Sequence, residues 1–257
     1  MRIKIIDTKV CESCRTKKCS FVDSIEKQNF YNLKSESTVC PTGKLVTGPD
    51  DGDFEKGYIC STKDAKCINC GLCIKQCPYN NLTVEDYEFI TTDFEGLIEL
   101  QYNAIALSYI NNILDFAANT NRNKALNFDG YANSVDGEQC FVEVDSQNDS
   151  LESCRRIIGD IISYNNNKST DDKIFNGLIV LKELPKVGSR DIYTLLEKML
   201  AFPATKNFNI YFSTFDVLRH LNLFAEDKTY TFDEGFFNPR QENTEDYITR
   251  INSITNV

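Results

Sequence analysis

One run of cysteines restricts what the first third of this chain can bind. Residues 67–78 read CINCGLCIKQCP. The cysteines of this run are Cys67, Cys70, Cys73 and Cys77, and Pro78 follows the last of them. This spacing is typical of iron–sulfur ligation, because thiolates separated by two residues can wrap around one small cubane. A structural zinc site or a disulfide framework fits the ordered spacing and the following proline less well. The run therefore predicts a [4Fe–4S] site.

A second set of cysteines lies upstream of this run. Its members are Cys11, Cys14, Cys19 and Cys40. The segment that begins at Cys40 reads CPTGKL, and the end of the first run reads CPYNNL, so the two look like corresponding ends of a duplicated unit. With both sets, residues 1–84 resemble a bacterial two-cluster ferredoxin, an α+β domain built from two strand–turn–helix–strand units.

The ferredoxin resemblance implies two [4Fe–4S] clusters. One would be held by Cys11, Cys14, Cys19 and Cys77, and the other by Cys40, Cys67, Cys70 and Cys73. The first half departs from the family, with four residues between Cys14 and Cys19 and twenty between Cys19 and Cys40, where the family has two and three. Cys60 is an additional thiol that could replace Cys19 or take no part. One cluster with spare or zinc-binding thiols is the alternative.

Eleven cysteines would suit a secreted disulfide scaffold, but the N-terminus MRIKIIDT has no apolar signal region. No stretch approaches the ~18 apolar residues that span a bilayer. The sequence therefore predicts a cytoplasmic protein without a membrane partner, in reducing conditions that suit iron–sulfur clusters. The single histidine, His220, argues against histidine-rich metal sites and against a Ser-His or Cys-His catalytic pair.

Charge divides the chain unevenly, although the net charge is −10. Residues 1–84 carry 13 Lys and Arg against 10 Asp and Glu, whereas the remaining residues carry 15 against 28. An acidic second part is not built to hold nucleic acid by bulk charge, which counts against DNA binding by that part alone.

The second part, residues 95–257, is expected to form an α/β domain with a mixed sheet. Apolar residues at helical spacing predict a first helix over residues 96–118. Residues 125–145 are expected to form a hairpin with a two-residue turn at 136–137, and Asp149 has the spacing of a capping box. Further strands are expected at 174–184 and 208–213, and further helices after Ser189, at 214–223 and at 244–254.

The hairpin carries carboxylates suited to a hard cation. Asp129, in NFDGYA, precedes Glu143-Val144-Asp145 by 14 residues. Carboxylates brought together on adjacent strands can bind Mg²⁺, which can activate water and neutralise a phosphodiester. By this DG…ExD pair and by the order of elements, residues 95–215 resemble the PD-(D/E)xK nuclease superfamily, which includes many restriction endonucleases.

The nuclease resemblance implies a restriction-endonuclease-like fold that acts on DNA. It implies Asp129, Glu143 and Asp145 as Mg²⁺ ligands and catalytic residues, with Glu99, or Glu95, as the acid of the first helix. Asp145 stands where the family has a lysine, and some members carry an acid there.

The register of the hairpin decides whether its acids can meet. A two-residue turn would pair Asp129 with Val144, so that Asp129 would face away from Glu143. The site therefore requires an odd-length loop or a bulge. Beyond the hairpin, Arg155 and Arg156 could meet a phosphate or lie on the exposed flank of their helix.

These features support three hypotheses about function. The first is a Mg²⁺-dependent DNA endonuclease of restriction or defence type, with clusters that are structural or that report redox state and DNA contact. The second is a ferredoxin-type electron-transfer protein, although the second domain has no flavin or nicotinamide glycine motif. The third is a non-catalytic subunit of a DNA-processing complex, with a degenerate nuclease fold that binds a protein partner or a second copy of itself.

Overall fold

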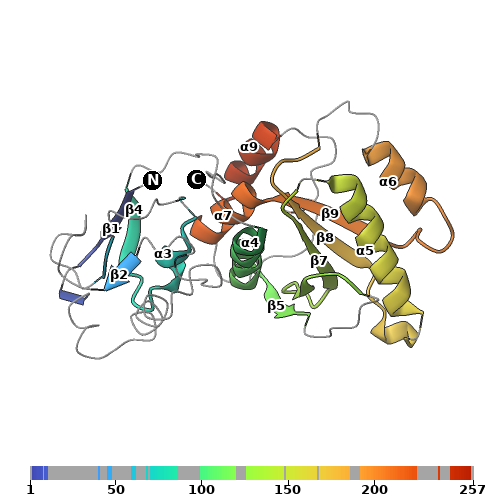
Figure 1. Ribbon diagram of the computed structural model, residues 1–257, viewed down its shortest axis with the longest axis horizontal. Coiled ribbons are helices and arrows are strands. Elements are labelled where there is room, and N and C mark those ends of the chain that lie inside the picture. Colours follow the sequence, from blue (N-terminus) through green and yellow to red (C-terminus); the bar gives the residue numbers. More distant parts are fainter. Residues whose placement is uncertain are drawn as a thin grey trace. The chain divides into compact units, whose positions relative to one another are not determined.

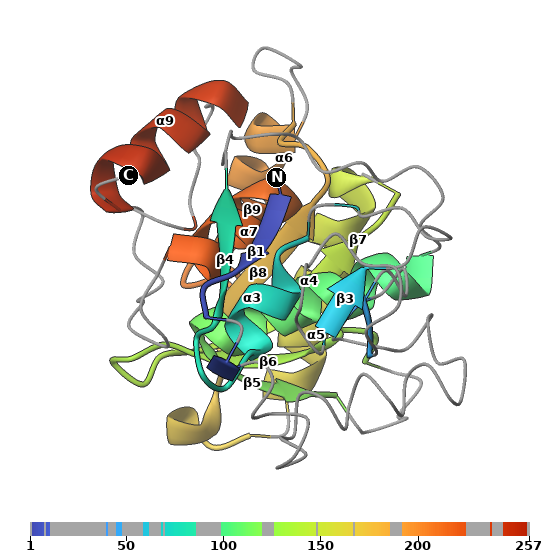
Figure 2. The same cartoon turned by 90° about the vertical axis from the view of Figure 1, so that its left-hand side faces the viewer.

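The structure of the protein is a computed structural model. It describes residues 2–7, 9–10, 40, 45–47, 59–61, 68, 70–85, 99–119, 126–147, 149–166, 168–185, 192–224, 237 and 244–255. The chain divides into two compact units, Met1–Ser108 and Tyr109–Val257, and the boundary falls within helix α4. Figure 1 labels most elements of both units, and Figure 2 also labels β3 and β6.

The first unit pairs strands that are far apart in the sequence. Strand β1 (Arg2–Ile5) is antiparallel to β4 (Leu82–Glu85), and a side-chain amide extends this pairing, because Asn81 accepts from the Asp7 N–H at 2.8 Å and donates to the Asp7 carbonyl at 2.7 Å. The other elements are β2 (Leu45–Thr47), its antiparallel partner β3 (Ile59–Ser61), and helix α3 (Leu72–Gln76). Figure 2 shows β1 and β4 side by side.

The second unit is built on one five-stranded mixed sheet in the order β5-β6-β7-β8-β9. The strands are β5 (Asp115–Ala118), β6 (Gly130–Asn133), β7 (Gln139–Asp145), β8 (Asn176–Leu181) and β9 (Asn209–Thr214). The pairs β5-β6 and β6-β7 are antiparallel, whereas β7-β8 and β8-β9 are parallel. Every residue of β8 is buried, as is typical of a parallel strand inside a sheet.

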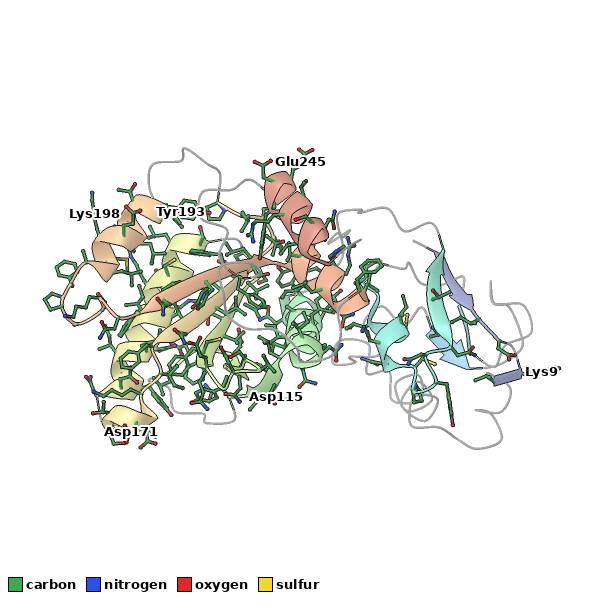
Figure 3. All side chains as sticks on the ribbon, turned by 180° about the vertical axis from the view of Figure 1, so that it is seen from behind. Lys9, Asp115, Asp171, Tyr193, Lys198 and Glu245 are labelled. Atoms are coloured by element: carbon green, nitrogen blue, oxygen red, sulfur yellow. The ribbon has the colours of Figure 1, made fainter. Side chains whose placement is uncertain are left out.

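Helices α5 (Ser150–Asn165) and α6 (Ile192–Leu200) connect the parallel strands. Helix α4 (Glu99–Ile113) precedes the sheet, α7 (Phe215–Phe224) and α9 (Thr244–Thr255) follow it, and a 3₁₀ turn, η1, lies at Thr170–Asp172. Helix α5 joins β7 to β8 and packs on both strands (Figure 1). Its capping box is confirmed, because the Asp149 carboxylate accepts from the Glu152 N–H at 3.2 Å. Asp115, Lys198 and Glu245 mark exposed positions of this unit (Figure 3).

The first helix is shorter than its apolar spacing predicts. It ends at Ile113 rather than at residue 118, and residues 115–118 form β5 instead. Strand β5 pairs with β6 so that Ala118 lies opposite Gly130, where an added Cβ would meet the Phe116 ring. A strand partner contributed by residues further along the chain outweighed the local helical pattern, which the periodicity of one segment cannot reveal.

The expected hairpin is present, but the prediction of a two-residue turn is wrong. The Ser134 N–H donates to the Glu138 carbonyl at 2.9 Å, which leaves a three-residue loop over residues 135–137. Gly137 occupies the left-handed region with φ 85°, and its N–H donates to the Ser134 carbonyl at 3.0 Å. This is the common three-residue hairpin loop that ends in a left-handed glycine.

Later elements agree with the sequence to within a few residues at their ends. Strand β8 lies inside the expected 174–184. Strand β9 and helix α7 each begin and end one residue later than expected, and α9 ends one residue later. The alternation of predicted helices and strands, with an apolar run for the buried strand, was therefore enough to predict this mixed α/β arrangement.

Aromatic side chains fix α5 against the hairpin. Phe141 of β7 packs on Tyr164 of α5 with ring centroids 5.3 Å apart, and it also packs on Phe128 at 4.4 Å. Tyr131 also packs on both Phe128 and Tyr164. Such ring pairs add to the energy of apolar burial, so they hold the helix in one position along β7.

Candidate functional site

The described cysteines of the first unit are buried. Four of the eight predicted ligands are described, and each is at most 9% exposed and outside any disulfide: Cys40, Cys70, Cys73 and Cys77. The other four lie outside the described residues: Cys11, Cys14, Cys19 and Cys67. Cys60 lies in β3 opposite Val46. Buried thiols gathered in a short segment are the donor set that an iron–sulfur cluster requires.

The cysteine run folds as a tight turn into a short helix. Gly71 adopts a left-handed conformation, with φ 73°, directly before α3, a conformation that glycine adopts without steric cost. Cys73 lies in the first turn of α3, and Cys77 ends the helix. The Asn80 N–H donates to the Cys77 carbonyl at 3.0 Å. The turn and the helix thus carry Cys70, Cys73 and Cys77 in one short segment.

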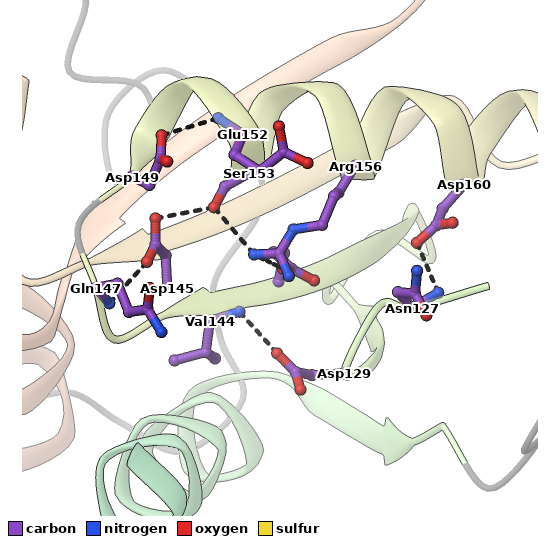
Figure 4. Close-up of polar contacts among 11 residues, drawn as sticks. Asn127, Asp129, Val144, Asp145, Gln147, Asp149, Glu152, Ser153, Arg156 and Asp160 are labelled. Atoms are coloured by element: carbon purple, nitrogen blue, oxygen red, sulfur yellow. Dashed lines mark hydrogen bonds and ion pairs between the residues drawn. The ribbon is translucent and has the colours of Figure 1, made fainter. Parts of the chain in front are cut away.

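In the second unit, a layer of polar side chains lies between β7 and α5 (Figure 4). We call it the polar layer, and its members are Glu143, Asp145, Ser153, Arg156 and Asp160, with Asp129 at its edge. Residues 141, 143 and 145 alternate along β7 and all contact α5, so they share one face of the strand. Buried helix–sheet contacts are usually apolar, so charged groups at this place require a specific reason.

Glu143 lies at the centre of the polar layer. Its side chain is 4% exposed, and its Oε1 lies 2.6 Å from Nη2 of Arg156, whose side chain is 40% exposed. Burial raises the Glu143 pKa to about 8, and repulsion from the Asp129 carboxylate adds to this, while the guanidinium opposes it. Loss of hydration and nearby negative charge therefore outweigh the ion pair, and this carboxyl group holds a proton near neutral pH.

Asp145 is held by hydrogen bonds from the start of α5. Its Oδ2 accepts from the Ser153 hydroxyl at 2.9 Å, and its Oδ1 accepts from the Gln147 N–H at 2.8 Å. The side chain is buried. Arg156 also reaches the Ser153 hydroxyl, at 3.5 Å, so one hydroxyl lies between the two charged groups. These bonds satisfy a buried carboxylate that has no ion pair with any side chain in the described part of the chain.

Asp129 lies at the edge of the polar layer, beside β7. Gly130 pairs with Val142, and the Asp129 N–H also donates to the Val142 carbonyl at 2.8 Å, so two residues oppose one as in a β-bulge. The odd-length loop alone would set Asp129 opposite Glu143, whereas the bulge sets it opposite Val142. The Asp129 carboxylate accepts from the Val144 N–H at 2.8 Å, and from there it lies near enough to Glu143 to raise the Glu143 pKa.

Asp160 was missed at the sequence level. It lies one helical turn beyond Arg156, is buried, and accepts from the Asn127 N–H at 3.0 Å. Burial raises its pKa, while the hydrogen bonds from the segment that precedes Asp129 lower it. The sequence does hold a signal for this residue. An acid stands between Ile157 and Ile161 on the apolar face of the predicted helix, where burying an unpaired charge costs free energy, so a partner could have been expected.

The predicted metal ligands form a looser group than the prediction implied. Among the described side chains, no three acids, cysteines or histidines are arranged to hold one metal ion. Asp129 and Glu143 are neighbours, whereas Asp145 is bound to Ser153. Two carboxylates still suit Mg²⁺, which commonly keeps several waters and takes one or two protein carboxylates. Glu95 and the side chain of Glu99 lie outside the described residues.

Other residues singled out in the sequence have structural surroundings. Arg155 points away from the polar layer and lies 3.9 Å from Glu152 on the exposed flank of α5. Burial raises the pKa of the Cys140 thiol and raises that of Cys154 to about 12, as expected of core thiols. His220 is a packing residue beside Phe224, because its ring centroid lies 4.9 Å away and burial lowers its pKa to about 4.

Comparison with known proteins bears on the cysteine run. Residues 64–83 match the family of 4Fe-4S binding domains. No curated protein and no solved structure matches the chain. The chain is thus an iron–sulfur protein with a 4Fe-4S binding motif, and the prediction of a cluster site at this run is confirmed.

Within the described ranges, no helix has the length and apolar character needed to cross a membrane.

Proposed function

We propose that this iron–sulfur protein is a DNA endonuclease whose α/β unit hydrolyses phosphodiesters with the help of Mg²⁺. The observation that carries the proposal is the Asp129 carboxylate, which is held by the Val144 N–H and lies near enough to Glu143 to raise the Glu143 pKa. The resemblance to the PD-(D/E)xK superfamily requires this pair of acids on adjacent strands. A two-residue turn would have separated the two side chains.

The residues of the polar layer have distinct roles in this proposal. Asp129 and Glu143 would hold the cation, which supplies Lewis-acid activation of water and neutralises phosphate charge. Glu143 gives up its proton to become a ligand, and the Val144 N–H keeps the Asp129 carboxylate in place. Asp145, which replaces the lysine of the family, orients Ser153 at the start of α5. The half-exposed Arg156 is left as the cationic side chain of the layer.

Cleavage of plasmid DNA with Mg²⁺ or Mn²⁺ tests the proposal. Asp129→Asn and Glu143→Gln should abolish cleavage, whereas Glu138→Gln, at an exposed position next to the hairpin loop, should leave it unchanged. Asparagine and glutamine preserve shape and hydrogen-bond acceptance but lose the charge that a cation requires. An inactive wild type on every DNA substrate, together with unchanged metal binding in both variants, would refute the proposal.

Electron transfer is the second candidate, and the 4Fe-4S binding motif favours it. We propose that the eight predicted cysteines hold two clusters, which can be tested by iron analysis after anaerobic purification. Two clusters correspond to about eight iron atoms per chain and one cluster to about four. Reversible reduction by dithionite, followed by electron transfer to a redox partner, would support this function. Clusters that dithionite does not reduce would exclude it.

A further inference from the structure

We propose that Arg156 changes its partner during the reaction, from Glu143 in the metal-free protein to a DNA phosphate once a divalent cation binds Glu143. This inference rests on the proposed function and assigns the phosphate-binding cation of the site. It makes cation binding and phosphate binding mutually dependent through one guanidinium group.

The position of Arg156 suits such an exchange. Its Nη2 lies 2.6 Å from Glu143 Oε1, and 40% of the arginine side chain is exposed against 4% of the glutamate. The guanidinium therefore lies between a buried carboxyl group and solvent. A group that approaches Glu143 from solvent on this side meets Arg156 first. A planar guanidinium has five donors and forms paired hydrogen bonds with phosphate as readily as with carboxylate.

The charges of the polar layer favour the exchange. The layer and its edge hold four carboxyl groups, those of Asp129, Glu143, Asp145 and Asp160, and Arg156 supplies the cation that opposes them among the described side chains here. A divalent cation at Asp129 and Glu143 would relieve this excess, and it would weaken the hold of Glu143 on Arg156 because it repels the guanidinium.

The adjacent arginine differs in its surroundings and supplies a matched control. Arg155 has the same charge and the next position on α5, but it is 59% exposed and lies 3.9 Å from the exposed Glu152. A general effect of positive charge on DNA binding would make both arginines matter. The proposed exchange makes Arg156 alone couple cation binding to phosphate binding.

The experiment measures how much Ca²⁺, a divalent cation that usually supports binding without cleavage, strengthens DNA binding by the full chain. A short fluorescein-labelled duplex is titrated with wild type, Arg156→Gln and Arg155→Gln, with and without Ca²⁺. Coupling between two sites commonly amounts to about 5–150-fold in affinity. We expect a Ca²⁺-dependent gain of about tenfold or more for wild type and Arg155→Gln, and little gain for Arg156→Gln.

Separate calorimetry of Ca²⁺ binding distinguishes the possible failures. It is run about one pH unit above the Glu143 pKa of about 8, so that protonation does not compete. If wild type binds no Ca²⁺, the proposed function fails and the exchange fails with it. If Arg156→Gln binds Ca²⁺ and keeps the full gain in DNA affinity, the exchange is refuted while the proposed function stands. An equal loss of the gain in Arg155→Gln also refutes the exchange.

Arg156→Lys is a control in case Arg156→Gln does not fold. Lysine keeps a positive charge near Glu143 but lacks the planar pair of donors. We expect a Ca²⁺-dependent gain between those of wild type and Arg156→Gln, with the circular dichroism spectrum of wild type. A gain equal to that of wild type would mean that no paired hydrogen bonds are made, and it would overturn the proposed contact.

Discussion

Glu143 should make the stability of this protein depend on pH in a way that one substitution removes. In the folded chain, the pKa of this carboxyl group is about 8 instead of 4.5, chiefly because it is buried. Between these two values the folded chain keeps a proton that the unfolded chain has released. Unfolding then releases a proton, so the free energy of unfolding falls as the pH rises through this window.

The magnitude follows from the two pKa values. Their difference is about 3.5, and one pKa unit corresponds to 1.36 kcal/mol, so full ionisation of Glu143 costs up to roughly 5 kcal/mol. Domains are commonly stable by only about 5–15 kcal/mol, so the effect is large. Glu143→Gln cannot ionise. It should therefore match wild type below pH ~5 and exceed its stability progressively up to pH ~8–9.

Urea denaturation followed by circular dichroism measures this difference. Wild type and Glu143→Gln are compared from pH ~5 to pH ~9, and the variant-minus-wild-type difference cancels contributions from other groups, including Asp160. Glu152→Gln removes an exposed carboxylate of α5 and should stay within about 0.5 kcal/mol of wild type throughout. Curves for wild type and Glu143→Gln that run parallel over the whole range would refute the electrostatic argument for the polar layer.

Three further substitutions test how the acids are positioned, each by urea denaturation. Asp129→Ala should destabilise the fold by about 1 kcal/mol or more, because the Val144 N–H of β7 loses its acceptor. Asp129→Asn keeps an acceptor there and should cost less. Equal costs would contradict a stabilising role for this hydrogen bond. Gly130→Ala should lower the free energy of unfolding by about 1–3 kcal/mol, because the new Cβ would lie 2.6 Å from the Ala117 carbonyl oxygen and against the Phe116 ring. An unchanged stability would show that β5 is not packed there. Asp149→Ala should cost about 1 kcal/mol by loss of the α5 N-cap, and Asp149→Ser should restore most of it unless the cap is unimportant.

Predictions succeeded where the pattern in the sequence was local. The spacing of the cysteine run needs no partner elsewhere in the chain to be recognised, and the match to the 4Fe-4S binding domain family confirms it. The capping box at Asp149 is also local, because its two groups lie three residues apart. The first cysteine set stays a prediction, since of its members only Cys40 is described.

Predictions failed where distant segments decided the outcome. Residues 115–118 continue a helical pattern, yet they form β5 because β6 offers a strand partner. The turn at Asp136–Gly137 has a two-residue signal, yet Ser134 and Glu138 close a three-residue loop. That one-residue difference moves the hairpin register so that Gly130 lies opposite Val142, and the Asp129 carboxylate then accepts from the Val144 N–H.

The sequence by itself determined the iron–sulfur motif, the alternation of helices and strands, and the presence of acids on one face of β7. Such features depend on residue type and on spacing within a short segment. Only the tertiary structure decided that Arg156 and Asp160 lie over those acids and that Glu143 holds its proton near neutral pH. The reason is that burial and the charges of neighbours set a carboxyl pKa, and both are supplied by segments that meet only when the chain folds.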